Sequence, residues 1–322
     1  MKNITVIGAG EAGIHFIKKI RSADKNSRIV LIDKRDFYFQ RSNIVNCWIP
    51  NGQCAITRFD DEFCSAYSLE YIKAVVERIN PNTKKIFLKE HPSVDFDTLI
   101  IASGAVSRDL SIRGDFREGV FYLSDIDPLI TRDYINISKD IILYVSTILG
   151  VRIALFLSSL GKDVKLIAEN LDFLEGYKQS FVNLFESRGI DTYLNCRMEE
   201  AIGERSLKAV RISLPKIFSA QVMFVDSGFT AGRILSDSGI SIDESFYTNY
   251  DGIYVLGEAA NKNIGKDKFF MNNADQARRQ ARLLAHHIAR TDMPDEGYSG
   301  TSVTTKEELL DKILQEETTH SI

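Results

Sequence analysis

The sequence lacks the usual features of membrane, secreted and nucleic-acid-binding proteins. None of its apolar runs reaches the ~18–20 residues that a membrane-spanning helix needs. Its 40 basic and 44 acidic residues give a formal net charge of −4 and are intermixed, so no basic stretch favours nucleic acid or an anionic membrane. With 44% hydrophobic and 26% charged residues in 322 positions, the composition predicts a globular protein of two domains.

Cysteine is also scarce. The four cysteines, Cys47, Cys54, Cys64 and Cys196, are too few for a disulfide scaffold, and their spacing does not match a zinc site. The N-terminus shows no charged and apolar segments of a signal peptide. We therefore expect reduced cysteines, no bound metal and a cytoplasmic location.

The first 33 residues read as a strand, a glycine turn, a helix and a second strand. Residues 4–7 are β-branched, residues 8–13 read Gly-Ala-Gly-Glu-Ala-Gly, and apolar residues then recur at helical spacing to Ile20. Residues 28–32 form the second strand, which ends on Asp33. A G-x-G-x-x-G motif between a strand and a helix, with an acid about 20 residues on, predicts a dinucleotide site.

Each part of this motif has a physical role. Gly8 permits the tight turn, Gly10 lets the backbone approach a pyrophosphate, and Gly13 lets the helix pack closely on the strand. The free N–H groups at the start of the helix, at Glu11 and Ala12, then bind phosphate. Asp33 can accept a hydrogen bond from a ribose hydroxyl. The alternative is a βαβ turn with a structural role only.

Two further stretches belong with this unit. Residues 34–50 are irregular and aromatic, so either a second domain or a flat ligand must cover them. Residues 96–101 form a buried strand that ends in the small residues 102–104, which let a backbone approach a ligand. Between these stretches, strands at 71–76 and 85–88 are expected to form a hairpin about the turn at 80–83.

A second βαβ unit follows, with strands at 141–145 and 164–167 and a helix at 150–160. Gly150 fills the helix-packing position, but Val145 and Thr147 replace the other two glycines, and the acid is displaced by one residue to Glu169. Each charge-assisted hydrogen bond lost costs about 1.5–3 kcal/mol. We therefore expect NAD(P)H to bind weakly or not at all, the domain then serving as scaffold and cover.

The chain then returns to the first domain. Residues 252–260 form a strand that meets the pair Gly257 and Glu258, and a helix spans about 273–290. A polar stretch and a short amphipathic helix at 306–315 complete the sequence.

The glycine motif, the small strand end and the Gly-acid pair, in this order, resemble the pyridine nucleotide-disulfide oxidoreductase superfamily of flavoproteins. The resemblance implies an α/β fold with two Rossmann-like, three-layer ββα domains, the second inserted in the first. The FAD-binding domain would comprise residues 1–112 and 243–290, the degenerate NAD(P)H-binding-like domain 113–242, and the C-terminal tail 291–322. The implied FAD contacts are Gly8, Gly10, Glu11, Ala12, Gly13, Asp33, Lys34, Ser42, Val76, Ala102, Ser103, Gly104, Gly257, Glu258, Gln276 and Ala277.

The resemblance also raises two questions. Family members usually continue into an interface domain, so here we expect a monomer or a non-standard oligomer, with the flavin open or covered by a partner or the tail. Cys47, in an Asn-Cys-x-x-Pro setting, is similar to the flavin-facing cysteine of coenzyme A disulfide reductases. It would be a redox thiolate; the alternative is a buried, inert thiol.

These observations predict an FAD-dependent oxidoreductase that moves electrons from NAD(P)H, a thiol or a protein donor to an unidentified small-molecule or protein acceptor. The alternative is an FAD-binding subunit or regulatory flavoprotein without NAD(P)H turnover of its own. A third interpretation is a scaffold that binds no flavin, in which the glycine motif has no role in cofactor binding.

Overall fold

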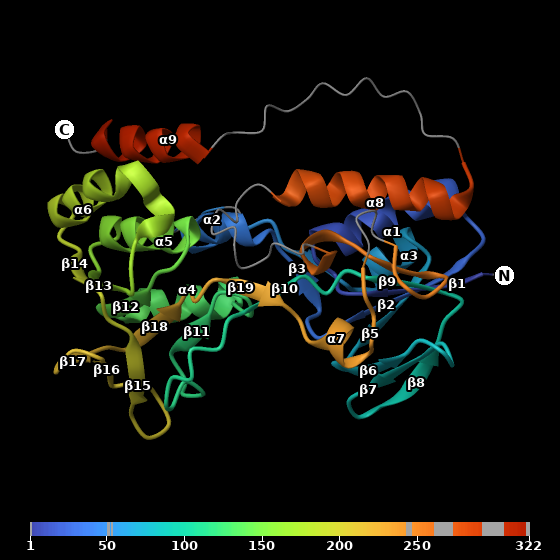
Figure 1. Ribbon diagram of the computed structural model, residues 1–322, viewed down its shortest axis with the longest axis horizontal. Coiled ribbons are helices and arrows are strands. Elements are labelled where there is room, and N and C mark those ends of the chain that lie inside the picture. Colours follow the sequence, from blue (N-terminus) through green and yellow to red (C-terminus); the bar gives the residue numbers. More distant parts are fainter. Residues whose placement is uncertain are drawn as a thin grey trace.

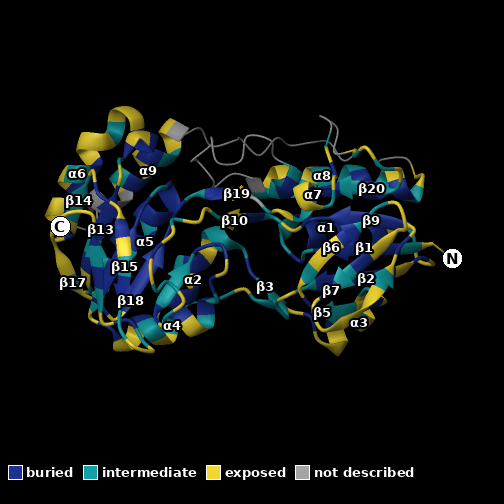
Figure 2. Ribbon diagram, turned by 60° about the horizontal axis from the view of Figure 1, so that its bottom comes forward, coloured by how far each residue is buried: buried dark blue, intermediate teal, exposed yellow. Residues whose placement is uncertain are grey.

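The protein contains two parallel five-stranded sheets, each covered by helices (Figure 1). The computed structural model describes residues 2–49, 52, 54–242, 247–260, 273–291 and 306–319. The central strands of both sheets are buried, whereas the edge strands are partly exposed and many exposed residues lie on the outer helices and hairpins (Figure 2). The predicted α/β class is confirmed.

The first sheet has the strand order β20-β9-β1-β2-β5. Its strands are β1 (Asn3–Ile7), β2 (Arg28–Asp33), β5 (Leu69–Lys73), β9 (Thr98–Ile101) and β20 (Ile253–Val255). Helices α1 (Glu11–Ala23) and α8 (Asn273–Ala289) pack together on one face, with α3 (Asp61–Ala66) beside them. The other face packs on an antiparallel sheet of β6 (Val76–Asn80), β7 (Lys85–Leu88) and β8 (His91–Asp95), and on α7 (Ile234–Asp237). These three layers are helix, parallel sheet and antiparallel sheet.

The expected single strand at 71–76 is wrong in detail. The chain leaves the main sheet after Lys73, and a separate strand, β6, begins at Val76. β6 makes the hairpin with β7 about the predicted turn, while β5 pairs with β2 in the parallel sheet. The apolar pattern continues through both strands, so it did not mark the point where the chain changes sheets.

The second sheet has the order β11-β18-β12-β13-β14. Its strands are β11 (Val120–Tyr122), β12 (Asp140–Tyr144), β13 (Asp163–Ala168), β14 (Asp191–Leu194) and β18 (Val222–Val225). The helices of this domain are α4 (Pro128–Ile137), α5 (Ile148–Ser159) and α6 (Lys178–Ser187), with a 3₁₀ segment η2 (Asp172–Tyr177). A small antiparallel sheet of β15 (Met198–Ile202), β16 (Ala209–Ile212) and β17 (Ile217–Ser219) completes it.

The second sheet is inserted between β9 and β20 of the first. Two chain segments connect the sheets and pair with each other as antiparallel strands β10 (Ala105–Ser107) and β19 (Phe229–Ala231). The inserted segment therefore begins and ends at one place, visible between the two halves in Figure 1.

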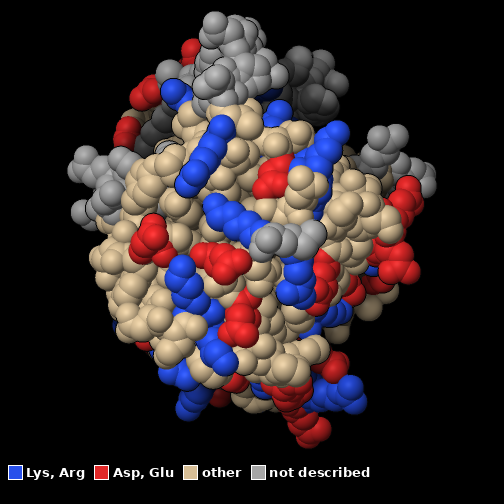
Figure 3. Space-filling view, turned by 90° about the vertical axis from the view of Figure 1, so that its right-hand side faces the viewer, with Lys and Arg blue, Asp and Glu red and all other residues tan. Residues whose placement is uncertain are grey.

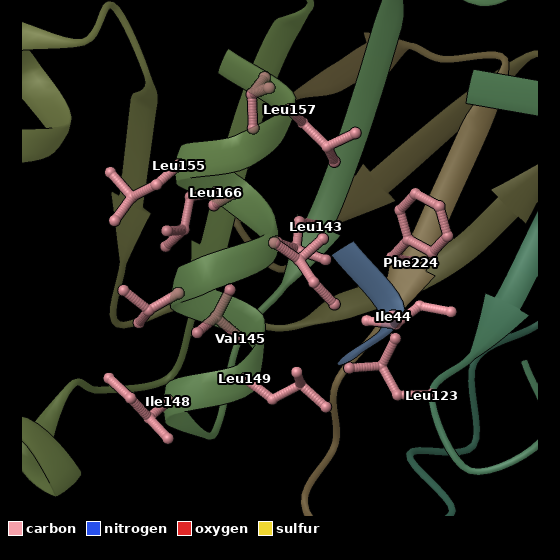
Figure 4. Packing of buried hydrophobic residues seen from close by; sticks show 14 of the residues in the cluster. Ile44, Leu123, Leu143, Val145, Ile148, Leu149, Leu155, Leu157, Leu166 and Phe224 are labelled. Carbon is pink, nitrogen blue, oxygen red and sulfur yellow. The ribbon is translucent and has the colours of Figure 1, made fainter. Parts of the chain in front are cut away.

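The second domain covers the aromatic stretch after Asp33, as one of our two alternatives predicted. This stretch forms β3 (Phe37–Tyr38), which pairs with β4 (Thr57–Arg58), then a 3₁₀ turn η1 (Arg41–Asn43) and α2 (Ile44–Trp48). Ile44 lies among Leu123, Leu149 and Phe224 of the second domain (Figure 4). α2 therefore contributes its buried side chains to the core of the other domain.

The last described helix, α9 (Lys306–Thr319), packs on α6 of the second domain (Figure 1). Leu310 and Ile313 are 1% and 6% exposed and belong to the core of that domain. The tail helix thus lies beside α6 rather than over the first sheet. The preceding polar stretch, residues 292–305, lies outside the described residues.

Charged side chains of both signs are intermixed over the end of the molecule formed by the first domain (Figure 3). Among the described residues, no helix has the length and hydropathy needed to span a bilayer.

Candidate dinucleotide site

A pocket lies at the carboxyl ends of β1, β2 and β9, against the start of α1. Twelve of the predicted site residues line it: Gly8, Gly10, Glu11, Ala12, Asp33, Ser42, Ala102, Ser103, Gly104, Gly257, Glu258 and Ala277. They come from segments far apart in the sequence, which the parallel pairing of β1 with β2 and β9 brings together. Leu149 of α5 adds a wall from the second domain.

The three glycines of the motif have different surroundings. Gly8 has φ +96°, and a Cβ there would lie 2.3 Å from the Ala102 carbonyl oxygen. A Cβ on Gly13 would lie 2.0 Å from the Gly8 carbonyl oxygen, so these two glycines are needed for packing. A Cβ on Gly10 would meet no atom within 4 Å. Gly10 therefore faces open space, as expected of the residue that admits a pyrophosphate.

The start of α1 is free to bind an anion. Its N-cap residue is Gly10, and within the described part of the chain no side chain caps its first turn. The N–H groups at a helix start carry partial positive charge and need acceptors. Because this end of the helix borders the pocket, a bound phosphate can supply the acceptors.

Asp33 is held rigidly at the end of β2. Its Oδ2 accepts a hydrogen bond from the Ala9 N–H at 2.6 Å, and its Oδ1 accepts one from the Arg35 N–H at 2.8 Å. Each carboxylate oxygen can accept more than one hydrogen bond. The acid therefore fixes the glycine turn and keeps acceptor capacity for a ribose hydroxyl.

A half-buried acid and a half-buried cation face each other on another wall. Arg41 Nη1 lies 3.9 Å from Glu258 Oε2, and the guanidinium sits over the Phe229 ring, 4.9 Å from its centroid. Burial raises the pKa of Glu258, while Arg41 and the Ala105 N–H act in the opposite direction. The adjacent Gly257 N–H donates to Gln280 Oε1 of α8 at 2.8 Å, which fixes the Gly-acid pair.

Our sequence reasoning missed the wall made by the aromatic stretch. Tyr38 donates a hydrogen bond to the Glu11 carboxylate, which also pairs with Arg278 of α8. The missed pocket residues are Arg35, Tyr38, Phe39, Gln40, Arg41, Leu149, Leu256 and Ala274. Part of the signal was present, because the run of aromatic residues in a loop indicated that something covers it.

Four predicted residues do not line the pocket. Gly13 supports it from behind, as described above. Lys34 pairs with Asp125, Val76 starts β6 in the antiparallel sheet, and Gln276 is exposed on α8. Their direct contact with a cofactor stays a prediction.

The expectation of reduced cysteines is wrong for one pair. Cys47 forms a disulfide with Cys54, with the two Cα atoms 4.2 Å apart. Between the two cysteines, the Gly52 N–H donates to the Ile49 carbonyl oxygen at 2.8 Å. The expectation of reduced cysteines came from their small number and the lack of a signal peptide, and neither feature predicts which cysteines lie close together.

Cys47 is 2% exposed and belongs to the hydrophobic core rather than to the pocket lining. Its role as a redox residue stays a prediction, and Pro50 of the Asn-Cys-x-x-Pro setting lies outside the described residues. Cys64 and Cys196 are free thiols, and burial raises the pKa of both.

A family model described as pyridine nucleotide-disulphide oxidoreductase matches residues 2–281. The chain belongs to this family. Among curated relatives, apoptosis-inducing factor 3 from Homo sapiens is 24% identical over 274 residues, covering 80% of this chain and 45% of that protein. Rubredoxin-NAD(+) reductase from Pseudomonas putida is 22% identical over 315 residues, covering 90% of this chain and 81% of that protein. The chain thus matches about half the length of the human relative.

Solved structures show the same fold. The covalent putidaredoxin reductase-putidaredoxin complex matches with a TM-score of 0.78 at 16% identity, over 92% of this chain and 77% of the other. The ferredoxin reductase for the CYP199A2 system of Rhodopseudomonas palustris matches with a TM-score of 0.75 at 18% identity, over 90% and 76%. This similarity confirms the expected pair of Rossmann-like domains.

Proposed function

We propose that this protein binds FAD in the pocket of the first domain and uses it for electron transfer. The observation that carries this proposal is the uncapped start of α1, which faces open space at Gly10. In the same pocket lie an acid at the end of β2 and the small residues that follow β9. A dinucleotide needs donors for phosphate, an acceptor for ribose and room for close backbone approach, and these residues supply all three.

Each part of the pocket has a proposed role toward the cofactor. The first turn of α1 binds the pyrophosphate, and Asp33 accepts hydrogen bonds from the adenosine ribose. Glu258, oriented through Gly257 and Gln280, lies where the ribityl chain is expected. FAD supplies the electron transfer, while the protein binds and orients it and sets the charge around it. Arg41 places a positive charge in this wall, beside Glu258.

The reaction is proposed to be an oxidoreductase reaction with a protein or small-molecule partner. The names of several relatives describe reductases of electron-transfer proteins, such as rubredoxin and ferredoxin, and one structural neighbour is held in a complex with putidaredoxin. The second candidate is an FAD-binding subunit that depends on a partner for its electrons. Val145 and Thr147, in place of glycines, favour this alternative because they remove backbone access to a second nucleotide.

The absorbance spectrum of the purified protein tests the proposal. We expect a flavin spectrum, with FAD identified by mass spectrometry of the released cofactor. Anaerobic addition of NADH and NADPH, followed by dithionite, then separates the two candidates. Bleaching by a pyridine nucleotide within seconds supports an independent reductase, and bleaching by dithionite alone supports the partner-dependent protein. Protein that neither retains nor takes up FAD refutes both.

Two matched glycine substitutions test the placement of the cofactor. Gly10→Ala adds a methyl group where no protein atom lies within 4 Å, so the fold should tolerate it but the pyrophosphate should not. Gly176 has equally open surroundings in the second domain, so Gly176→Ala is the control. We expect Gly10→Ala to weaken FAD binding at least about tenfold, a change of about 1.4 kcal/mol, and Gly176→Ala to leave it unchanged. Equal FAD affinity of the two variants would contradict the proposed site.

A further inference from the structure

The two βαβ units can be compared residue by residue through their strand pairing. In the first, the Gly8 N–H donates to the Ile32 carbonyl oxygen at 2.9 Å; in the second, the Val145 N–H donates to the Ile167 oxygen, also at 2.9 Å. Val145 therefore corresponds to Gly8. By the same count, Thr147 corresponds to Gly10, Gly150 to Gly13 and Ala168 to Asp33.

The neighbouring strands extend this comparison. The Ala102 N–H, just after β9, donates to the Ile7 oxygen at 2.7 Å, and the Asp226 N–H, just after β18, donates to the Tyr144 oxygen at 2.9 Å. Ile7 and Tyr144 are the last residues of β1 and β12. Asp226 in the second unit thus stands where Ala102 stands in the first, and a carboxylate replaces a methyl group.

This carboxylate occupies the start of α5. Its Oδ2 accepts hydrogen bonds from the Thr147 N–H at 2.8 Å, the Thr147 Oγ1 at 2.9 Å and the Ser146 N–H at 3.2 Å. Asp226 itself is 1% exposed. N–H groups at a helix start are the donors that a nucleotide phosphate uses. In the first unit the corresponding Ala9 N–H donates to Asp33 Oδ2 at 2.6 Å, whereas in the second the buried Asp226 accepts from both the Ser146 and the Thr147 N–H.

Gly150 shows how closely the carboxylate fits. A Cβ on Gly150 would lie 2.4 Å from Asp226 Oδ2, whereas a Cβ on Gly13 would lie 3.4 Å from the Ala102 methyl group. The glycine at 150 is thus required by the internal carboxylate, whether or not a nucleotide binds. On the ribose side, Ala168 stands at the position of Asp33, and the acid that lines the cavity with Ser146 and Thr147 is the next residue, Glu169.

We propose that Asp226 is a built-in substitute for the nucleotide phosphate and excludes NADH and NADPH from the second domain. Asp226 accepts from Ser146 and Thr147, directly before Ile148 and Leu149, whose N–H groups correspond to the phosphate donors Glu11 and Ala12. A pyrophosphate bound there would lie beside the buried carboxylate, and the two negative charges would repel each other. If the proposed FAD function holds, the flavin is then reduced by a donor that does not bind at the start of α5, such as a thiol or an electron-transfer protein. The geometry of the exclusion itself does not depend on FAD.

Anaerobic isothermal titration calorimetry of the purified protein with NADH and NADPH tests this proposal. We expect no saturable binding to the wild type at nucleotide concentrations up to about 1 mM. Asp226→Ala restores the residue type of the first unit and should give saturable binding with a dissociation constant of about 0.1 mM or below, at least about tenfold under the wild-type limit. Thr147→Gly combined with it should strengthen binding further. Asp226→Asn keeps an oxygen that can accept the same hydrogen bonds but removes the negative charge, so its affinity for the nucleotides should lie between those of the wild type and Asp226→Ala.

Either of two results overturns the proposal. One is micromolar binding of NADH or NADPH to the wild type, a measurement that needs no variant to fold. The other is folded Asp226→Ala and double variants that bind no more tightly than the wild type. The flavin absorbance of the same samples reports separately on the first domain. Protein without flavin that also fails to bind NADH would refute the proposed FAD function and leave the exclusion supported.

Discussion

Trp48 is the only tryptophan in the chain, and it lies where α2 enters the core of the second domain. Its ring is 1% exposed, its Nε1–H donates to Thr131 Oγ1 at 2.9 Å, and its centroid lies 5.2 Å from that of Phe224. The aromatic stretch that borders the pocket leads directly into this helix. The stability of the contact therefore measures how firmly the second domain holds that wall.

The structure sets the expected magnitudes. Trp48→Phe removes the hydrogen bond, worth about 1 kcal/mol, and leaves space where the larger ring was; truncation to Ala would cost about 3–5 kcal/mol. We expect Trp48→Phe to lower the free energy of unfolding by about 2 kcal/mol. Thr131→Val leaves the buried indole N–H without an acceptor and should cost about 1–3 kcal/mol. Both single variants lose the same hydrogen bond, so the double variant should be more stable than additivity predicts by about 1 kcal/mol.

Urea unfolding followed by far-UV circular dichroism measures all three variants, since Trp48→Phe removes the indole fluorescence. Thr131→Ser is the control: it keeps the oxygen that accepts the indole hydrogen bond, so its effect and that of Trp48→Phe should be additive in their double variant. Additivity within about 0.3–0.5 kcal/mol for Trp48→Phe and Thr131→Val is the behaviour of independent sites. That result would refute the buried hydrogen bond and the docking of α2 that depends on it.

Three further predictions concern other parts of the chain. Gly8→Ala should destabilise the protein by more than about 1 kcal/mol, because φ is +96° and the new Cβ would lie 2.3 Å from a carbonyl oxygen; thermal unfolding measures this. Leu310→Ala and Ile313→Ala should each weaken the docking of α9 by about 2–3 kcal/mol, seen as faster amide exchange in that helix. Burial raises the pKa of Asp226, so the folded state holds this proton more tightly than the unfolded state and stability falls as pH rises from the usual aspartate value towards the raised one. The stability of Asp226→Asn relative to the wild type should therefore increase with pH over that interval, as measured by urea unfolding at a series of pH values.

Contrary results have clear meanings. A Gly8→Ala variant of wild-type stability would contradict the close approach of β1 and β9. Amide exchange in α9 unchanged by either substitution would show that its apolar side is not packed on the second domain. A difference between Asp226→Asn and the wild type that does not vary with pH would mean that the carboxyl titrates normally.

Both βαβ units could be predicted from the sequence because their information is local. The motif around Gly8 and the strand that ends on Asp33 encode a turn, a helix and a second strand within one short segment. Strand ends such as Ala102 could be added, because the carboxyl ends of parallel strands meet at one edge of the sheet. Most of the predicted pocket residues lie directly at such ends, which is why the structure brings them together.

The remaining features depend on contacts that the sequence pattern does not specify. Arg41 reaches the pocket only because α2 is anchored in the second domain, which orients the stretch before it. The disulfide joins Cys47 and Cys54, whose separation of 7 residues matches no recognised spacing. Asp226 lies 79 residues after Thr147 in the sequence, and only the pairing of β12 with β18 brings its carboxylate to α5.

The comparison of the two units explains why the second βαβ unit can lose two glycines of its motif without losing the stability of its fold. A helix start buried at the edge of a sheet must have an acceptor for its N–H groups. In the first unit the small Ala102 leaves that place open to a ligand, whereas in the second Asp226 fills it from within the chain. The second domain can therefore be fully stable with no nucleotide bound. Stability of this domain on its own would then carry no evidence for NAD(P)H binding, and only a direct binding measurement can decide between a reductase and a partner-dependent flavoprotein.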